Sequence, residues 1–178
     1  MDIGVISVRY ARALLKSAIE QKLDTAVYKD MQCLADSYIR VPRLRSTIDN
    51  PMLAKDMKQK LLLTACGGNP SQLSERCVKL VLKADRESMM QFMANSYITL
   101  YRQKKNVILG RLITATAVTP ATEQKMRQMV ESRTNGTVEF ATEVNPDIIG
   151  GFILEYDTYR LDASVKAKLN TILNTLRK

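Results

Sequence analysis

The side chains that most often do chemistry in proteins are scarce in this sequence. It contains no histidine, which removes histidine general bases, catalytic triads built on histidine and nearly all metal sites that need an imidazole. Its three cysteines, Cys33, Cys66 and Cys77, form no CxxC pair and leave one thiol over under any disulfide scheme, which suits a reducing compartment. We interpret all three as small, buried apolar residues.

Motifs for nucleotide or acyl chemistry are missing as well. The sequence has neither a GxxxxGK[ST] nor a GxGxxG pattern, and Ser164 has no histidine to activate it. A lysine-based or carboxylate-pair mechanism stays open, although no pattern points to one. We therefore expect a protein that is not an enzyme, with no catalytic residue, no metal site and no cofactor.

The charge of the chain is uneven. The net charge of the 178 residues is +9, and up to Lys105 there are 18 basic against 10 acidic residues, compared with 9 against 8 after it. Such an excess favours an acidic partner, which could be nucleic acid, anionic lipid or an acidic protein surface. Ordinary solvated lysines and arginines explain it equally well.

Targeting signals are not evident in the sequence. No apolar run approaches the roughly 20 residues of a membrane span, and no signal-peptide apolar region follows Met1. We expect a protein kept in a cytosol-like compartment.

The chain before residue 106 has the hydrophobic period of helices throughout. We predict a first helix over 5–22, a second that Asp24 caps, and a short third around residues 44–48. The second should carry an apolar stripe of Val27, Met31, Leu34 and Tyr38. The fourth begins near Leu53 and ends at Gly67-Gly68, where glycine allows a left-handed cap. The fifth begins at Asn69-Pro70 and runs to about Ala84. On the fifth we expect burial of Leu73, Cys77, Leu80 and Val81, and on the sixth an exposed end that carries Tyr97, Tyr101, Lys104 and Lys105.

After Asn106 the hydrophobic period changes from about 3.6 to 2, which is typical of strands. Alternating apolar residues predict strands near 107–117, 138–144 and 152–156. One helix should follow Thr119-Pro120 and another should follow a cap at Asp162. The predicted fold class is therefore α+β, with an N-terminal six-helix bundle over residues 1–105 and a small βαββα domain over residues 106–178.

The first predicted helix has more apolar surface than one neighbour can cover. On a helical wheel Arg9, Arg12, Lys16 and Glu20 occupy an arc of only about 80°. The helix could lie centrally in its own bundle and be covered from two sides. Alternatively, one side could form a groove for a helix of another chain, with small residues such as Ala11, Ala13, Ser7 and Ser17 allowing close approach.

Three segments carry a resemblance to a known family. Residues 8–14, VRYARAL, resemble the Y-A-x-A-L start of the delta subunit of bacterial F-type ATP synthase, whose mitochondrial counterpart is the oligomycin-sensitivity-conferring protein. The more specific match is VNPDIIGGFIL at 144–154, which resembles the family's V-D-P-x-L-I-G-G segment and the strand after it. LDASVKAKL at 161–169 resembles its closing I-D-G-S-V-R-x-x-L, with Ala163 in place of the usual glycine. The glycines at 150–151 also have a structural reading, because they permit a bulge or a close backbone approach at the strand entrance.

The resemblance implies a non-catalytic stator component. In such a family the helical domain binds the N-terminal helix of an alpha subunit on the catalytic head. The C-terminal domain holds the b-type peripheral stalk subunits, so that the head resists rotary torque during proton-driven ATP synthesis. The implied location is peripheral, on the cytoplasmic face of a bacterial inner membrane, with membrane association only through the complex. The resemblance assigns the groove that binds the alpha helix to the first and fifth predicted helices of this chain. The predicted groove residues are Tyr10, Ala11, Leu14, Val78, Val81 and Leu82.

A nucleic-acid-binding module is the alternative, because the chain is basic and a βαββα half could imitate an RNA-binding sheet. Residues 151–156, GFILEY, faintly resemble an RNP-type strand. However, Glu155 would repel phosphate, and the basic excess lies in the other half. We therefore expect no nucleic-acid partner.

Overall fold

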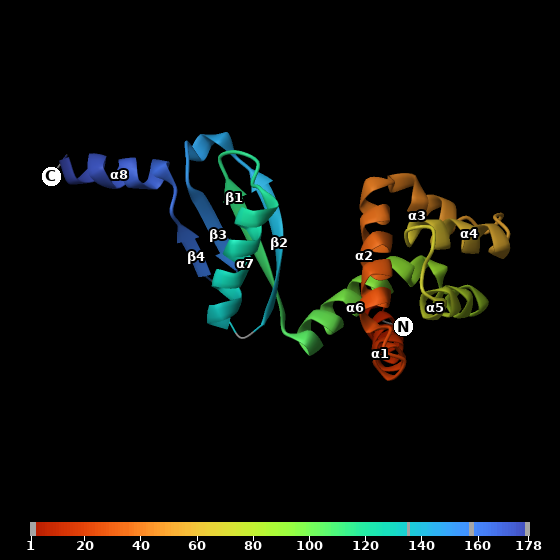
Figure 1. Cartoon of the computed structure of the whole chain (residues 1–178). Helices are drawn as coiled ribbons and strands as arrows, with labels where there is room; N and C mark the ends of the chain where they lie inside the picture. Colours follow the sequence, from red (N-terminus) through yellow and green to blue (C-terminus); the bar gives the residue numbers. More distant parts are fainter. Residues whose placement is uncertain (1–2, 135, 157–158, 177–178) are drawn as a thin grey trace. The chain divides into compact units, whose positions relative to one another are not determined.

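The computed structural model describes residues 3–134, 136–156 and 159–176. The chain divides into two compact units, Met1–Gln103 and Lys104–Lys178, which we call the helical unit and the sheet unit (Figure 1). The division lies beside the position at which the hydrophobic period changes in the sequence.

The helical unit is built from α-helices joined by short loops. Its longest elements, α1 and α2, follow one another directly at the start of the chain (Figure 1). A 3-10 turn over Glu87–Met89 precedes the last helix. The bounds are α1 Ile3–Glu20, α2 Asp24–Arg40, α3 Pro42–Ile48, α4 Lys55–Ala65, α5 Gln72–Lys83 and α6 Met90–Lys105.

The core of this unit is centred on α2. The predicted stripe of Val27, Met31, Leu34 and Tyr38 is buried along its whole length, as expected for apolar residues that recur at i, i+4, i+7 and i+11. Asp24, however, is the first residue of α2, and the cap position belongs to Leu23. The prediction that Asp24 caps this helix was therefore wrong by one residue.

The end of α6 differs from its prediction. Tyr97 and Tyr101 are buried, whereas Lys104 and Lys105 are exposed as predicted. The Tyr101 ring stacks on Tyr28 of α2 with centroids 4.1 Å apart, and the Tyr97 hydroxyl donates a hydrogen bond to the Asp24 carbonyl at 3.3 Å. Aromatic stacking and a polar contact for the hydroxyl explain why these tyrosines can enter the core.

Two further burial predictions failed. Leu80 on α5 was expected in the core, but 56% of it is exposed. Cys33 is exposed and Cys77 is half-buried, so that only Cys66 is fully buried as expected. Burial raises the pKa of the Cys66 thiol to about 12 and that of Cys77 to about 11, so that both thiols stay protonated at neutral pH.

The sheet unit contains one mixed four-stranded sheet in the order β2-β1-β3-β4. β1 pairs with β2 in parallel, while the β1–β3 and β3–β4 pairs are antiparallel. β4 was not predicted, so the expected βαββα order is short of one strand. Its four residues, Tyr-Arg-Leu-Asp, are all exposed, and a single short alternation of this length gives a weak strand signal. The bounds are β1 Val107–Thr114, α7 Pro120–Thr134, β2 Thr137–Val144, β3 Phe152–Tyr156, β4 Tyr159–Asp162 and α8 Val165–Leu176.

Helix α7 covers one face of the sheet (Figure 1). Leu112, Val138 and Leu154 from three strands pack with Val130 of α7. Phe152 and Tyr156 pack against this cluster too. The aromatic residues of β3 therefore pack against the hydrophobic core of the sheet unit.

On the opposite face the charged side chains pair with one another. Arg111 forms ion pairs with Glu143 and Glu155, and Arg160 lies 3.5 Å from Glu155. An RNA-binding sheet needs exposed aromatic residues and unpaired cations on one face. This sheet presents neither arrangement on the strands β1 and β3, which argues against the nucleic-acid alternative.

The entrance of β3 depends on Gly151. This residue has φ +76°, and a side chain there would collide with the Ala163 carbonyl, which confirms the predicted close backbone approach. Asp162 does not cap α8 as predicted. It accepts a hydrogen bond from the Ser164 amide at 3.0 Å, and the Ser164 hydroxyl accepts one from the Ala167 amide at 3.1 Å. Ser164 therefore caps the helix, and the hydrogen bonds from Ser164 hold the pKa of Asp162 below its ordinary value.

Candidate helix-docking groove

One side of α1 faces the core of the helical unit. Ile6, Ala11, Leu15 and Ala18 are buried there, and so is Ser7. Helix α1 therefore has an interior face. However, Val5, Val8 and Ile19 are exposed, so coverage by its own bundle, the first of the two explanations, accounts for only part of the apolar surface. The remaining apolar surface of α1 needs a second explanation.

A second side of α1 lines an open groove against α5. The groove has a volume of about 190 Å³. Each helix contributes one ridge at i, i+4 and i+7: Tyr10, Leu14 and Ser17 from α1, and Leu73, Cys77 and Leu80 from α5. Ridges with this spacing are what a third helix needs to pack against two others. Ala13 and Arg76 complete the lining.

The floor and the rim of the groove differ in exposure. Leu73 is nearly buried at the floor, whereas 56% of Leu80 is exposed at the rim. Covering Leu80 with another molecule would be favourable, because burying a leucine side chain contributes roughly 1.5 to 3 kcal/mol. The groove therefore has the character of an unoccupied helix-binding surface.

Tyr10 is held in place at one end of the groove. Its hydroxyl accepts a hydrogen bond from the Arg86 guanidinium at 3.0 Å, and the same guanidinium carbon lies 5.5 Å from the centre of the Tyr10 ring. Two contacts from one arginine fix the ring orientation. This end of the groove is therefore formed before any partner arrives.

Asp30 of α2 holds the other helix of the groove. Its Oδ2 atom accepts hydrogen bonds from the Ser71 amide, the Ser71 hydroxyl and the Ser74 hydroxyl, at 2.9, 2.7 and 2.7 Å. Ser71 also caps α5 by accepting from the Ser74 amide, which places the helix start two residues later than the predicted Asn69-Pro70. One carboxylate thus ties the beginning of α5 to α2.

The predicted groove residues divide into two groups in the structure. Tyr10 and Leu14 line the groove. Ala11, Val78, Val81 and Leu82 are at most 3% exposed and belong to the core beneath, so they support the groove without lining it. The lining residues that the prediction left out are Leu73, Arg76, Cys77 and Leu80. Their signal was the i, i+4, i+7 repeat on α5, which we assigned to the core.

The sheet unit has an exposed apolar helix. On α8 an apolar stripe is exposed along its length, from 38% at Val165 to 80% at Leu176, and includes Leu169, Ile172 and Leu173. The α8 charges within residues 165–176 are both positive, Lys166 and Lys168. This helix is a second candidate surface for a partner.

Other kinds of site are not indicated in the described part of the chain. No cluster of three or more histidine, cysteine, aspartate or glutamate side chains there could hold a metal ion. Within the same residues no helix combines the length and the apolar character that crossing a membrane requires.

Comparison with known proteins identifies the family. Residues 6–176 match the family model described as ATP synthase delta (OSCP) subunit. The protein named ATP synthase subunit delta from Phocaeicola vulgatus is 46% identical, over 97% of this chain and 94% of its own length. Its counterpart from Parabacteroides distasonis is 41% identical over 97% and 96%.

A solved structure shares the fold. A chain of the Toxoplasma gondii mitochondrial ATP synthase hexamer, determined by cryo-EM, superposes with a TM-score of 0.61 at 20% identity and covers 97% of both chains. The match of nearly the whole length in sequence and in fold leaves one conclusion: the chain belongs to the ATP synthase delta (OSCP) subunit family and is a non-catalytic stator component of the peripheral stalk of the F-type ATP synthase.

Proposed function

We propose that this subunit joins the catalytic head to the peripheral stalk through two separate surfaces. The α1/α5 groove binds the N-terminal helix of an alpha subunit, and α8 of the sheet unit binds b-type stalk subunits. The observation that carries the first assignment is the pair of i, i+4, i+7 ridges around an exposed Leu80. A linker with a surface at each end can keep the head from turning with the central shaft without any bond chemistry.

The groove suits a helix more than a small ligand. Its lining comes from two neighbouring helices and is mainly aliphatic or small. The docked helix would cover Leu14 and Leu80, which lie on the opposing ridges, and Ala13 and Ser17 would allow its backbone to approach closely. Arg86 and Asp30 hold the two sides in position, so little ordering is required on binding.

The α8 stripe supports the stalk assignment. Five apolar residues at helical spacing are exposed on one side, whereas Asn170 and Asn174 lie on another side of the same helix. A second helix packed along this stripe would give the paired-helix contact that amphipathic helices commonly form. Within the complex, the subunit would lie peripherally on the cytoplasmic face of a bacterial inner membrane and would reach the membrane only through its partners.

The groove is tested by replacing its exposed leucine in the full chain. Leu80→Asp should weaken binding of a synthetic alpha N-terminal peptide by about 10- to 100-fold, because one leucine side chain loses its burial. Isothermal titration calorimetry gives the affinity, and circular dichroism shows whether the fold is retained. Unchanged affinity in a folded variant would reject the groove.

Two controls accompany this measurement. Leu61→Asp places the same change on α4, where Leu61 is 36% exposed and lies outside the groove lining, and it should leave the affinity unchanged. Val78→Asp should instead unfold the helical unit, because Val78 is fully buried. Recovery of the alpha and b-type subunits with the tagged chain from membranes tests the assembly as a whole, and recovery of nucleic acid alone would contradict it.

A further inference from the structure

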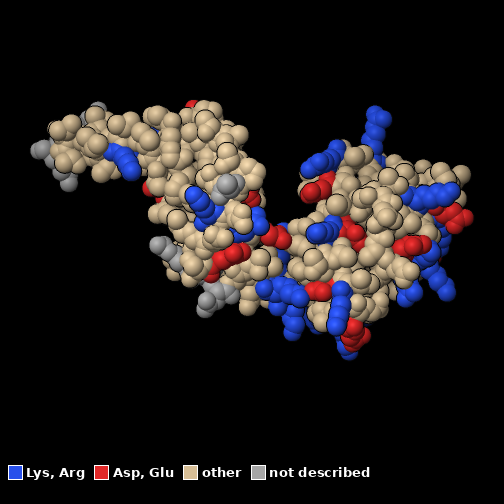
Figure 2. All heavy atoms as spheres, in the orientation of Figure 1, with Lys and Arg blue, Asp and Glu red and all other residues tan. Residues whose placement is uncertain are grey.

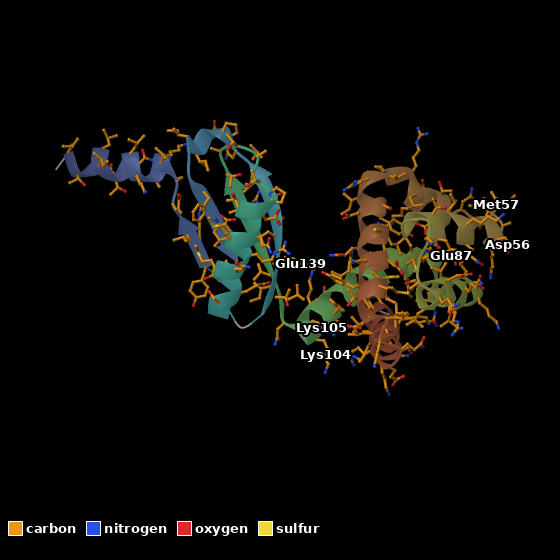
Figure 3. The ribbon with its side chains drawn as sticks, in the orientation of Figure 1. Asp56, Met57, Glu87, Lys104, Lys105 and Glu139 are labelled. Carbon is orange, nitrogen blue, oxygen red and sulfur yellow. The ribbon has the colours of Figure 1, made fainter. Side chains whose placement is uncertain are left out.

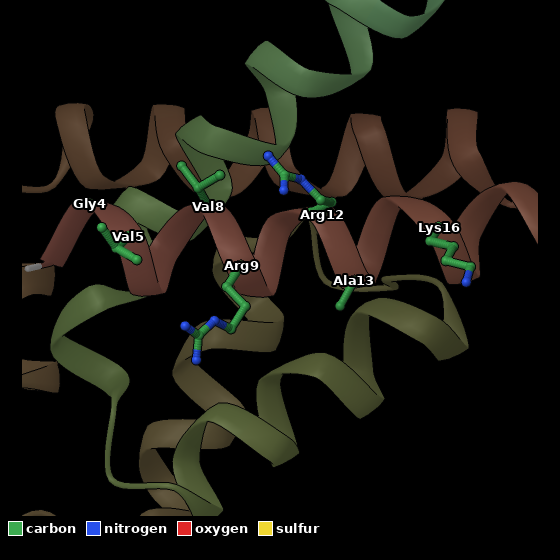
Figure 4. Close-up of a pocket in the computed structure, with 7 residues that line it drawn as sticks. All are labelled: Gly4, Val5, Val8, Arg9, Arg12, Ala13 and Lys16. Atoms are coloured by element: carbon green, nitrogen blue, oxygen red, sulfur yellow. The ribbon is translucent and has the colours of Figure 1, made fainter.

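A second feature of α1 lies beside the groove. A wide, open depression of about 690 Å³ runs along the exposed side of this helix. Figure 4 shows it from the front, with Val5 and Val8 at one end and Lys16 at the other. Its lining includes three cations, Arg9, Arg12 and Lys16, which fall within an arc of about 60° on a helix with 3.6 residues per turn.

These three cations form no ion pair with the described residues, although Glu20 follows Lys16 by one turn on the same side of α1. No acidic side chain of the described residues lines the depression. Other cations of the helical unit do find partners: Lys55 pairs with Asp85, Lys58 with Glu87 and Lys79 with Glu75. The lysines and arginines of the unit are spread over its surface in Figure 2, but on α1 they form a row.

The depression adjoins the groove at one residue. Ala13 lines both of them. In Figure 4, Arg9 and Lys16 extend to the same side of α1 as Ala13, whereas Arg12 extends to the opposite side. On the opposite ridge, Arg76 of α5 also lines the groove without an ion pair among the described residues. A helix seated in the groove would therefore have cations along both of its edges.

We infer that the helix bound in the groove has an acidic edge, with carboxylates beside its apolar stripe that face Arg9 and Lys16. This inference rests on the proposed function and specifies the chemistry of the partner. Because Arg9 and Lys16 are seven residues apart on α1, the carboxylates must recur at about the same spacing, i and i+7. Exposed charges at the rim of an apolar contact act mainly on the rate of association and on its salt dependence.

The test uses the full chain and two synthetic alpha N-terminal peptides, one with its native carboxylates and one with every Asp and Glu replaced by Asn and Gln. In the chain, Arg9→Gln and Lys16→Gln are combined. At low ionic strength the combined variant should bind the native peptide with an association rate about tenfold lower, and the difference should shrink as salt screens the charges. Stopped-flow fluorescence with a labelled peptide gives the rates.

A matched control variant separates the effect of the α1 cations from the effect of a lower net charge. Lys29→Gln and Arg43→Gln remove the same number of exposed cations from α2 and α3, and neither residue lines the groove or the depression. This control should slow association by much less than the α1 variant. The neutral peptide should bind the unmodified chain and the α1 variant at the same rate.

The outcomes separate the inference from the proposed function. Binding that is lost in Leu80→Asp but insensitive to the α1 cations, to the peptide's carboxylates and to salt would overturn the acidic edge and keep the groove. Binding that is unaffected by Leu80→Asp would overturn the groove, and the inference with it. Affinity of the chain for anionic lipid vesicles that depends on the α1 cations, with no effect of these cations on the peptide, would assign the row to a lipid surface and overturn the inference.

Discussion

At the scale of single residues, the ion pair between Lys58 and Glu87 is the most buried one described in the chain. Lys58 Nζ lies 2.6 Å from Glu87 Oε1, and the side chains are 4% and 15% exposed. Figure 3 labels Glu87 in the helical unit. Burial opposes ionisation of Glu87, but the hydrogen bond and the charge of Lys58 outweigh it, so the pKa of Glu87 lies below its ordinary value of 4.5.

This pair predicts a pH dependence of stability. Because the pKa of Glu87 is lower in the folded chain, its contribution is complete above pH 4.5 and is lost as the pH falls through the folded value. Glu87→Gln should lower the free energy of unfolding by about 3 kcal/mol at neutral pH, because it leaves Lys58 buried without a counter-charge. The deficit should shrink in acid.

Urea unfolding followed by circular dichroism across this pH range gives the comparison. Glu20→Gln is the control, because Glu20 is exposed and forms no ion pair with the described residues. A deficit of the same size at every pH would contradict the ionised pair.

Residues also show where sequence reasoning reaches its limit. The stripe on α2 was predicted correctly because apolar periodicity and burial agree there. Leu80 continues an equally regular stripe on α5, yet it is exposed. Apolar periodicity identifies a helix face that is suited to burial. It does not distinguish burial in the chain's own core from burial against a partner.

At the scale of elements, the position of α5 depends on the Asp30 carboxylate. Asp30→Ala would leave the Ser71 groups and the fully buried Ser74 hydroxyl without their acceptor. We expect a loss of about 2 kcal/mol in the free energy of unfolding, together with weaker binding of the alpha peptide because one side of the groove is no longer held.

Two variants make this prediction specific. Asp30→Asn retains an acceptor oxygen and should recover part of both losses, whereas Asp36→Ala on the exposed side of the same helix should change neither. Chemical denaturation and calorimetry measure the two properties. Full peptide affinity in a destabilised Asp30→Ala variant would show that α5 keeps its place without this carboxylate.

Element boundaries were predictable where local chemistry decides them. Gly67 and Gly68, which both have positive φ, follow α4 as predicted. β4 escaped prediction because its residues are all exposed, so its place in the sheet comes from pairing with β3. The burial of the α6 tyrosines was not predicted, because a single sequence does not show that Tyr28 of α2 lies where it can stack with Tyr101.

At the scale of the whole molecule, the division into two units predicts two independent binding activities. Leu169→Glu combined with Leu173→Glu should abolish recovery of b-type subunits, since it places two charges in the exposed stripe of α8. Affinity for the alpha peptide should stay unchanged, because the groove lies in the other unit.

The matched control changes the other side of the same helix. Asn170→Glu with Asn174→Glu adds the same charge outside the stripe and should retain the b-type subunits. Co-purification from membranes reads out one activity and calorimetry the other. Loss of b-type subunits in both variants would move the stalk surface away from the α8 stripe.

The exposed stripe of α8 also bears on how the chain behaves before assembly. An uncovered row of Val165, Leu169, Ile172, Leu173 and Leu176 is adhesive toward any similar surface, including the same helix on another copy. Chains made in excess of their stalk partner would therefore tend to cluster, and the tendency would rise with concentration. Synthesis of this protein and its stalk partner in equal amounts would therefore limit aggregation, in addition to providing both subunits for assembly of the complex.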